Sequence, residues 1–292
     1  MSELLKTTNL IKSFGRHLVF SNLNLKLGEG KVHGLLGLNG EGKTTLIRIL
    51  LGVIPPDAGQ IQYKDNAVSY RSDAYKQEVG YIPEDPFFYG GMRVGELLDF
   101  NAAFYRRWDA MRAADLLKRF SLDRRARIRT LSRGMKLRLE MAVALAAGPA
   151  LLVLDDPTSG LDVPTRYDFL QDIIRELADS GTTILFSTHL VHELERIVDH
   201  LFILHRGRLI LDEGYETVKK FTRRVRLVFE GEPPRTLGVD GVLCETREGQ
   251  RMEAVVYPWS ADKQKKMEEF SPTVLHVEPL TLEQVFRSFV AG

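Results

Sequence analysis

Gly37-Leu38-Asn39-Gly40-Glu41-Gly42-Lys43-Thr44-Thr45 is the stretch of sequence that decides the fold of this chain. It fits the pattern G-x-x-x-x-G-K-[ST], in which glycines let successive backbone N–H groups curl round an anion. Lys43 can reach the β- and γ-phosphates of a nucleotide, and the hydroxyl of Thr44 can bind Mg²⁺. The stretch therefore predicts a phosphate loop whose other binding residues are Asn39, Gly40, Glu41, Gly42 and Thr45.

The residues on either side of this loop are the ones that a phosphate site needs. Residues 32–36 form an apolar run typical of a buried strand, and residues 45–51 have the pattern of a helix. A helix that starts at the loop presents its N-terminus to the phosphates, where its dipole favours negative charge. This context favours a phosphate site over an ordinary glycine-rich turn.

Composition and charge indicate an ordinary globular protein. The chain has 292 residues, enough for about two domains, and its net charge of +1 gives no global field that marks a nucleic-acid or membrane binder. Its single cysteine, Cys244, cannot form an internal disulfide and is typical of a reducing cytosol. The longest apolar run, 141–154, is shorter than the ~20 residues of a bilayer span, so we expect that the chain does not cross a membrane by itself.

The order of apolar patterns predicts an α/β fold. Strand patterns at 4–11 and 17–27 predict an antiparallel N-terminal sheet, and strand–helix alternation predicts a mainly parallel core sheet. Between these parts the apolar residues recur with a period of 3.6, which predicts a helical subdomain at about 86–148. The alternation ends near residue 222, so we predict one domain over 1–222 and a small α+β domain over 223–292, with regulation or dimer contact as its role.

Two carboxylates follow the strand pattern at 151–154 directly. At the carboxyl edge of a parallel sheet Asp155 can hold Mg²⁺, and Asp156 can act as general base toward an attacking water. A strand-ending Asp-Pro turn is the structural alternative, but the phosphate loop upstream favours the metal site.

Two further motifs point to an anion. Ser132 is a good N-cap for the apolar helix that follows, and Gly134 in its first turn makes this helix start a second potential phosphate site. A plain helix cap explains Ser132 equally well. His189 follows another strand pattern, where it can contact a γ-phosphate or serve structure alone. Two anion-binding helix starts in one chain hint that one nucleotide is bound by two copies.

The order of these elements closely resembles the ATP-binding cassette (ABC) transporter ATPases. The resemblance covers roughly residues 3–220, with LSRGM as signature, LLVLDDP as magnesium strand, then SGLD and STH. It implies a P-loop NTPase cassette in which Phe14 stacks on adenine, and in which Ser132 and Gly134 bind the ATP of a second cassette. The ending at 278–286 is similar to that of bacterial exporter ATPases of the multidrug and polysaccharide type.

The resemblance also implies cofactors, partners and a location. ATP and Mg²⁺ are expected to close a head-to-tail pair of cassettes, with a second copy or a homologous subunit, and hydrolysis reopens it. A separate transmembrane permease is expected to dock beside the helical insert, which places the chain on the cytoplasmic face of the cell membrane. Candidate docking residues, with core packing as an equal alternative, are Phe87, Phe88, Tyr89 and Met92.

Three departures from the family pattern affect the expected chemistry. Asp156 stands where a catalytic glutamate is common, and its side chain is about 1.5 Å shorter. Glu84 stands where a glutamine commonly senses the metal and water; it can still ligate Mg²⁺, but it adds charge. In the signature, Arg133 and Met135 replace the commoner glycine and glutamine. Slow hydrolysis or a reshaped site is therefore possible.

Other functions remain as alternatives at this stage. A soluble ATP-switched assembly or regulatory protein, or a nucleotide-sensing subunit with slow turnover, also fits a cassette with Asp156. The cations crowded over 118–138 favour a solvated surface, of a kind that suits anionic lipid headgroups, over a nucleic-acid site. The sequence leaves the transported molecule and its direction open.

Overall fold

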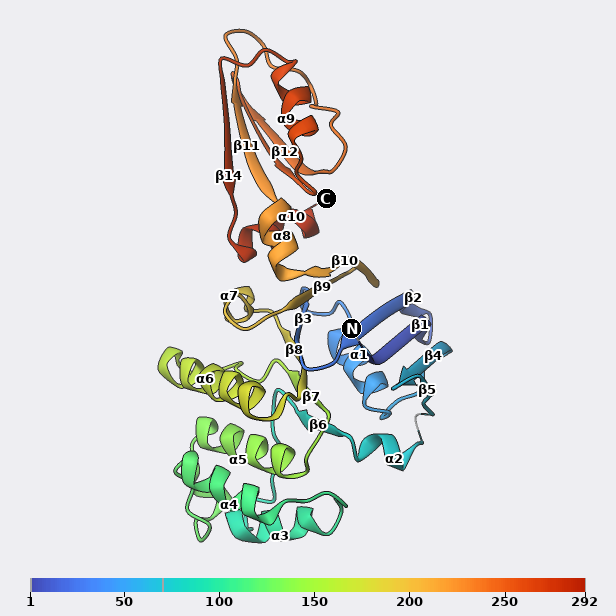
Figure 1. Cartoon of the computed structure of the whole chain (residues 1–292), viewed down its shortest axis with the longest axis vertical. Helices are drawn as coiled ribbons and strands as arrows, with labels where there is room; N and C mark the ends of the chain where they lie inside the picture. Colours follow the sequence, from blue (N-terminus) through green and yellow to red (C-terminus); the bar gives the residue numbers. More distant parts are fainter. Residues whose placement is uncertain (1, 70, 292) are drawn as a thin grey trace. The chain divides into compact units, whose positions relative to one another are not determined.

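The computed structural model describes residues 2–69 and 71–291 (Figure 1). The chain divides into two compact units, one of residues 1–189 with 204–209 and one of residues 190–203 with 210–292. The predicted boundary after residue 222 coincides with the start of a tail sheet at Arg223, whereas the second unit also includes 190–203 and 210–222. The assignment of two domains stays a prediction.

The first unit contains an antiparallel sheet built from the N-terminal residues, as predicted. Its strands are β1 (Glu3–Phe14), β2 (His17–Gly28), β4 (Ala58–Tyr63) and β5 (Asn66–Ala67), in the order β2-β1-β4-β5. Alternate residues of β1 and β2 are buried, which is the pattern of a sheet with one face on a core.

A parallel sheet forms the centre of the first unit. Within it β3 (Val32–Leu36), β8 (Thr183–Thr188), β7 (Leu151–Asp155) and β6 (Val79–Ile82) lie in that order, with parallel pairing throughout. All residues of β3, β7 and β8 are buried, which explains why they read as continuous apolar runs rather than as alternating ones. The register pairs Leu36 with Thr188 and Asp155 with Ser187, so the carboxyl ends of three strands meet at one edge.

Helices connect these strands and form the predicted insert. Helix α1 (Lys43–Leu50) follows β3, and α6 (Val163–Ser180) lies between β7 and β8 in the sequence. Helix α2 (Asp73–Lys76) precedes β6, and the insert that follows β6 holds α3 (Val94–Ala102), α4 (Ala110–Arg119), the 3-10 helix η1 (Ile128–Thr130) and α5 (Arg133–Ala146). Helix α5 packs on α3, α4, α6 and β6, which joins the insert to the sheet.

Cations of the insert pair with carboxylates from other segments. Arg124 lies 2.6 Å from Asp99, and Arg138 lies 3.5 Å from both Asp168 and Asp172 of α6. These pairs neutralise part of the charge crowded over 118–138, which agrees with the interpretation of that stretch as a solvated surface.

The second unit carries a separate antiparallel sheet. Its strands β11 (Arg223–Val228), β12 (Val242–Glu248), β13 (Arg251–Val256) and β14 (Val274–Pro279) lie in the order β12-β13-β11-β14. One face packs on Met267 of α9 (Ala261–Glu268) through Val225, Leu227, Met252, Ala254 and Val256. The remaining helices of this unit are α7 (Val191–Leu194), α8 (Tyr215–Phe221) and α10 (Leu282–Ala291).

Two strands each contain residues of both units. These are β9 (His200–His205) and β10 (Arg208–Gly214), which are neighbours in one sheet. Arg206 and Gly207 join them with φ angles of 48° and 73°, the left-handed pair that a two-residue hairpin turn requires. This turn belongs to the first unit.

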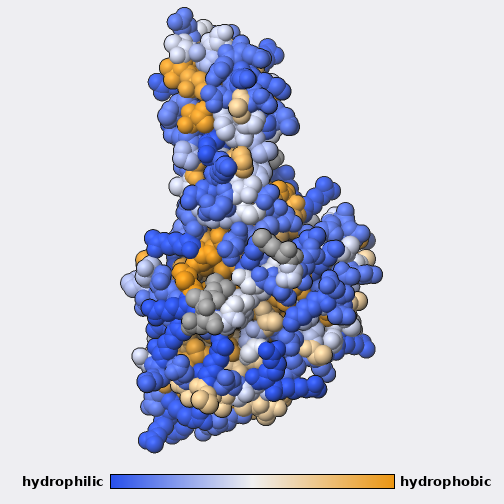
Figure 2. All heavy atoms as spheres, in the orientation of Figure 1, coloured by the Kyte–Doolittle hydropathy of each residue, from blue (hydrophilic) through white to orange (hydrophobic). Residues whose placement is uncertain are grey.

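The face of the molecule shown in Figure 2 is mainly polar. In the view of Figure 2, hydrophilic residues dominate and apolar residues form separate patches. Among the described residues, none of the helices combines the length and the apolar composition that a membrane span requires.

Candidate functional site

Backbone geometry makes the loop at 37–45 a preformed anion cradle. Gly40 and Gly42 have φ angles of 85° and 96°, which L side chains rarely adopt. A Cβ on Gly42 would lie 2.6 Å from Val19 Cγ1, and one on Gly37 would lie 2.7 Å from the Leu204 carbonyl oxygen. Helix α1 starts here with no side-chain cap and no acidic residue in its first turn, so its first N–H groups and its dipole suit an anion.

Lys43 lies inside this loop. Its side chain is buried, and Nζ donates hydrogen bonds to the carbonyl oxygens of Gly37 at 2.8 Å and Leu38 at 3.1 Å. Burial lowers the pKa of the Lys43 ammonium, while the carboxylates of Asp156 and Asp155 oppose that shift. The cation is therefore held in the cradle by backbone oxygens, in position to exchange them for phosphate oxygens.

The two residues predicted to hold a metal at the loop are in contact. Thr44 is the second residue of α1, and its hydroxyl hydrogen-bonds to the carboxylate of Asp155, the buried last residue of β7. Burial raises the pKa of Asp155, and the Thr44 bond opposes the rise. A hydroxyl and a carboxylate are hard oxygen donors, which fit Mg²⁺ because that ion keeps several waters and needs no all-protein cage.

Glu84, the third predicted metal residue, follows β6 and is exposed. Its charge contributes to the pKa shifts of both Lys43 and Asp155, so it acts on the same edge of the sheet. The next residue, Asp85, pairs with Arg133 of α5 at 3.2 Å, which ties this segment to the helical insert.

Asp156 and His189 form a direct pair. Asp156 follows β7 with a φ angle of 49°, a left-handed conformation that Asp tolerates better than most residues. Its N–H donates to the Ser187 carbonyl oxygen at 2.8 Å, and its Oδ2 contacts Nδ1 of His189. Oδ1 faces the Thr188 hydroxyl at 3.4 Å. The neighbouring strands β7 and β8 thus bring together two residues that were predicted from separate sequence motifs.

The signature residues lie on the insert rather than at this edge. Ser132 caps α5, because its Oγ accepts a hydrogen bond from the Met135 N–H at 3.2 Å. A Cβ on Gly134 would lie 2.5 Å from Thr165 Cγ2, so close packing alone requires glycine there. Ser132 is exposed, which leaves this helix start open to a partner.

The predicted adenine contact is also open. Phe14 ends β1 with a relative exposure of 53%, and Nζ of Lys12 lies 5.2 Å from its ring centroid. Lys12 is held in turn by Asp57 at 2.7 Å. An exposed ring at the end of a strand can stack on a base.

The candidate docking residues divide into two groups. Phe87 and Tyr89 are 84% and 63% exposed, and their rings meet edge to face with centroids 5.8 Å apart. The alternative of core packing is therefore wrong for these two. Phe88 and Met92 are half-buried.

Comparison with known proteins identifies the family. A family model described as ABC transporter matches residues 20–159. The bacitracin transport ATP-binding protein BcrA of Bacillus licheniformis is 36% identical over 228 residues, which are 77% of this chain and 74% of that protein. This chain belongs to the ABC transporter ATP-binding proteins. The ABC transporter ATP-binding protein YtrB of Bacillus subtilis (strain 168) is similar over 99% of both chains, at 28% identity.

A solved structure supports the same assignment. The structure described as that of the ATP binding subunit of an ABC transporter has a TM-score of 0.67 and 29% identity, and it covers 74% of this chain and 92% of that one. The chain is therefore an ATP-binding subunit of an ABC transporter. The ATP-binding proteins of this family are ATPases. The alternative of an assembly or regulatory protein is not favoured, and the α/β cassette fold is confirmed.

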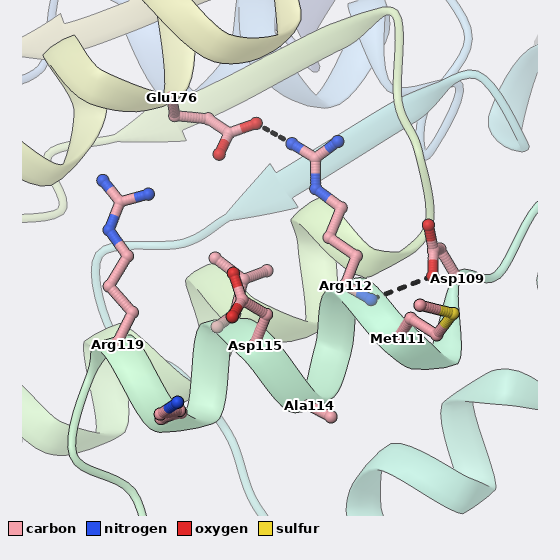
Figure 3. Close-up of a pocket in the computed structure, with 9 residues that line it drawn as sticks. Asp109, Met111, Arg112, Ala114, Asp115, Arg119 and Glu176 are labelled. Carbon is pink, nitrogen blue, oxygen red and sulfur yellow. Dashed lines mark hydrogen bonds and ion pairs between the residues drawn. The ribbon is translucent and has the colours of Figure 1, made fainter.

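One pocket of the cassette lies away from its phosphate loop. It is lined by residues of α4 and by Glu176 of α6; in Figure 3, Arg112 points toward Glu176 and pairs with it. Asp109 caps α4 by accepting from the Arg112 N–H at 2.9 Å. These residues pack the helical insert against α6, and this contact is structural rather than catalytic.

Sequence reasoning missed the partners of Glu41. Glu41 was expected in the loop only as part of the motif, but its carboxylate contacts His205 and the N–H of Arg206 on the β9–β10 turn. No local sequence pattern predicts this contact, because the residues lie more than 160 positions apart.

Proposed function

We propose that the cassette binds Mg–ATP at residues 37–45 and hydrolyses it to drive an exporter. The observation that carries this proposal is the gathering of Lys43, Thr44, Asp155, Asp156 and His189 at one edge of the parallel sheet. In sheets of this kind ligands bind outside the carboxyl ends of the strands. The N–H groups at the start of α1 and the Lys43 ammonium bind the triphosphate, and the ring of Phe14 stacks on adenine.

Thr44, Asp155 and Glu84 would hold the magnesium ion. The bound ion supplies neutralisation of charge on the β- and γ-phosphate oxygens. On the protein side, the Thr44 hydroxyl gives up its bond to Asp155 and directs its oxygen to the site. Glu84 adds a negative charge from the segment after β6.

Asp156 is the proposed general base, and His189 positions it. His189 contacts Oδ2, so the other oxygen, Oδ1, is the one that receives a proton from the attacking water. The Thr188 hydroxyl at 3.4 Å from Oδ1 is at the long limit of a hydrogen bond and is easily replaced by that water. His189 is exposed, so its ring can also reach the γ-phosphate.

A second cassette and a permease complete the proposed machine. Ser132 and Gly134 at the start of α5 would bind the ATP of a second copy or of a homologous subunit. The exposed rings of Phe87 and Tyr89 suit an apolar contact with a transmembrane partner, which would hold the cassette at the cytoplasmic face of the cell membrane. Two similar proteins are named Nod factor export ATP-binding proteins, which supports export as the direction.

Nucleotide titration of the Lys43→Ala variant tests this function. Removal of the buried ammonium should abolish ATP binding in calorimetry and ATPase activity in the presence of Mg²⁺. Lys64→Ala is the matched control, because Lys64 pairs with Glu78 at 3.9 Å away from the loop. Unchanged ATP affinity in Lys43→Ala would contradict the assignment, as would activity that persists after Mg²⁺ is chelated.

A further inference from the structure

We propose that Glu41 is a positioning residue that holds the phosphate loop in its ATP-receiving form by clamping it to the β9–β10 turn. The inference rests on ATP binding at this loop. It concerns a residue that occupies a variable position of the motif, where the pattern itself requires no carboxylate.

The clamp uses both carboxylate oxygens of Glu41. Oε1 lies 2.9 Å from Nδ1 of His205, and Oε2 accepts a hydrogen bond from the Arg206 N–H. Both side chains of this contact are mostly shielded, with relative exposures of 14% for Glu41 and 12% for His205. Charge-assisted bonds in a shielded site are stronger than neutral ones in water.

The turn that receives Glu41 is itself fixed. A Cβ on Gly207 would lie 2.5 Å from the Val19 carbonyl oxygen, so the turn packs directly on β2. Val19 also lies against Gly42, at 2.6 Å from the place of a Cβ. The phosphate loop is thus enclosed by β2 on one side and the turn on another. Glu41 supplies the polar bonds that join loop and turn.

The negative charge of Glu41, taken by itself, should weaken ATP binding. A negative charge in a loop that must receive a triphosphate repels the ligand. Burial lowers the pKa of Lys43, and the negative charge of Glu41 is among those that oppose this shift, so it acts on the binding cation. A gain from loop geometry must therefore offset this repulsion. The left-handed glycines on both sides of Glu41 leave the loop free to move unless something fixes it.

His205 provides a way to separate geometry from charge. Among the described residues no hydrogen-bond partner reaches its buried Nε2. A glutamine at position 41 can still accept from the Arg206 N–H, and its amide can face Nδ1 if the imidazole proton moves to Nε2. Glu41→Gln therefore keeps the clamp and removes the charge, whereas Glu41→Ala removes both.

The test compares ATP affinity and steady-state kinetics of the full-length variants. We expect Glu41→Ala to raise the Kd and KM for ATP about tenfold, because it removes both hydrogen bonds of the clamp while the relief of charge repulsion offsets part of that loss. Turnover at saturating ATP should fall by less than about threefold, because bound phosphates themselves order the loop. Glu41→Gln should bind ATP at least as tightly as the wild type. His200→Gln is the control, since His200 forms a similar pair with Asp212 at 2.7 Å elsewhere.

Each other outcome overturns the clamp. If both Glu41 variants bound ATP more tightly than the wild type, Glu41 would act on ATP only through its charge. If both bound ATP as the wild type does, Glu41 would have no role in ATP binding. A loss of turnover with unchanged KM would place Glu41 in the chemical step. If Glu41→Ala does not fold, His205→Ala removes one of the two bonds and should raise KM about threefold; an unchanged KM would refute the inference. A wild-type protein that binds no ATP would instead contradict the proposed function.

Discussion

Replacement of Asp156 by asparagine tests the proposed general base. The change keeps the size of a side chain that is only 13% exposed, and it removes the negative charge that would accept a proton from water. General-base catalysis typically contributes 10²–10⁴-fold, so we expect turnover to fall by about 100-fold or more. ATP affinity should change by less than about threefold, because Lys43 and the start of α1 bind the phosphates independently of Asp156.

The companion change Asp156→Glu measures how well the short side chain is placed. Asp156 already reaches His189 and has a backbone φ angle of 49°, which suits Asp better than Glu. The added methylene moves the carboxylate by about 1.5 Å, and a misplacement near 1 Å can cost about 100-fold. We therefore expect Asp156→Glu to lower turnover, by about tenfold after relaxation of the loop. A higher turnover would mean that reach limits the wild-type rate.

Single-turnover hydrolysis and calorimetric ATP binding provide the two readouts. Asp156→Asn should also accumulate an ATP-bound dimer in sedimentation, because reopening requires hydrolysis. Asp212→Asn is the matched control, since it alters another carboxylate–imidazole pair outside the site. Wild-type hydrolysis by Asp156→Asn, accompanied only by a lower melting temperature, would refute the reasoning and leave Asp156 as a structural turn residue.

Three further predictions concern assembly, the tail and pH. With hydrolysis blocked, Mg–ATP should convert monomer to dimer in sedimentation, and Ser132→Arg should prevent this by filling the exposed helix start; a dimer indifferent to both would argue against ATP shared between two copies. A chain truncated after Thr222 should still fold and bind ATP, because, within the described part of the chain, β11 pairs with β13 and β14 and with no strand of the other two sheets; loss of folding would show that the tail belongs to the cassette core. Burial raises the pKa of Glu140 to about 7, so ionisation should destabilise the folded state progressively from about pH 4.5 to 7, by about 3 kcal/mol at most. Glu140→Gln should flatten the melting temperature over this range, and a pH dependence equal to that of the wild type would contradict the cause.

Local motifs made much of the cassette predictable. The phosphate loop is contiguous, so its spacing predicts a glycine-rich anion loop followed by a helix; the helix begins at Lys43, two residues before the predicted start at residue 45. The cap at Ser132 is equally local. The capping box at residue 281 is local as well, since the Thr281 N–H donates to Gln284 and the Gln284 N–H donates back to Thr281. Each of these features depends on residues within a few positions of one another.

Surface exposure was harder to predict from the sequence. Phe87 and Tyr89 read as either core or docking residues, because an aromatic side chain has the same pattern in both settings. Their exposure depends on where the segment after β6 runs relative to the helical insert. The domain boundary at residue 222 likewise stays a prediction, since the division by contacts places 190–203 and 210–222 with the tail.

The sequence by itself determined the family, the phosphate loop and the residue types of the site. Only the tertiary structure decided how these residues meet: Asp156 with His189, and Glu41 with the turn after β9. The physical reason is that a fully buried parallel strand is a continuous apolar run whichever strands flank it. The order of the strands in the sheet therefore cannot be predicted from the local spacing of apolar residues. The order β3-β8-β7 sets which strand ends share an edge, and that shared edge brings Asp156 to His189.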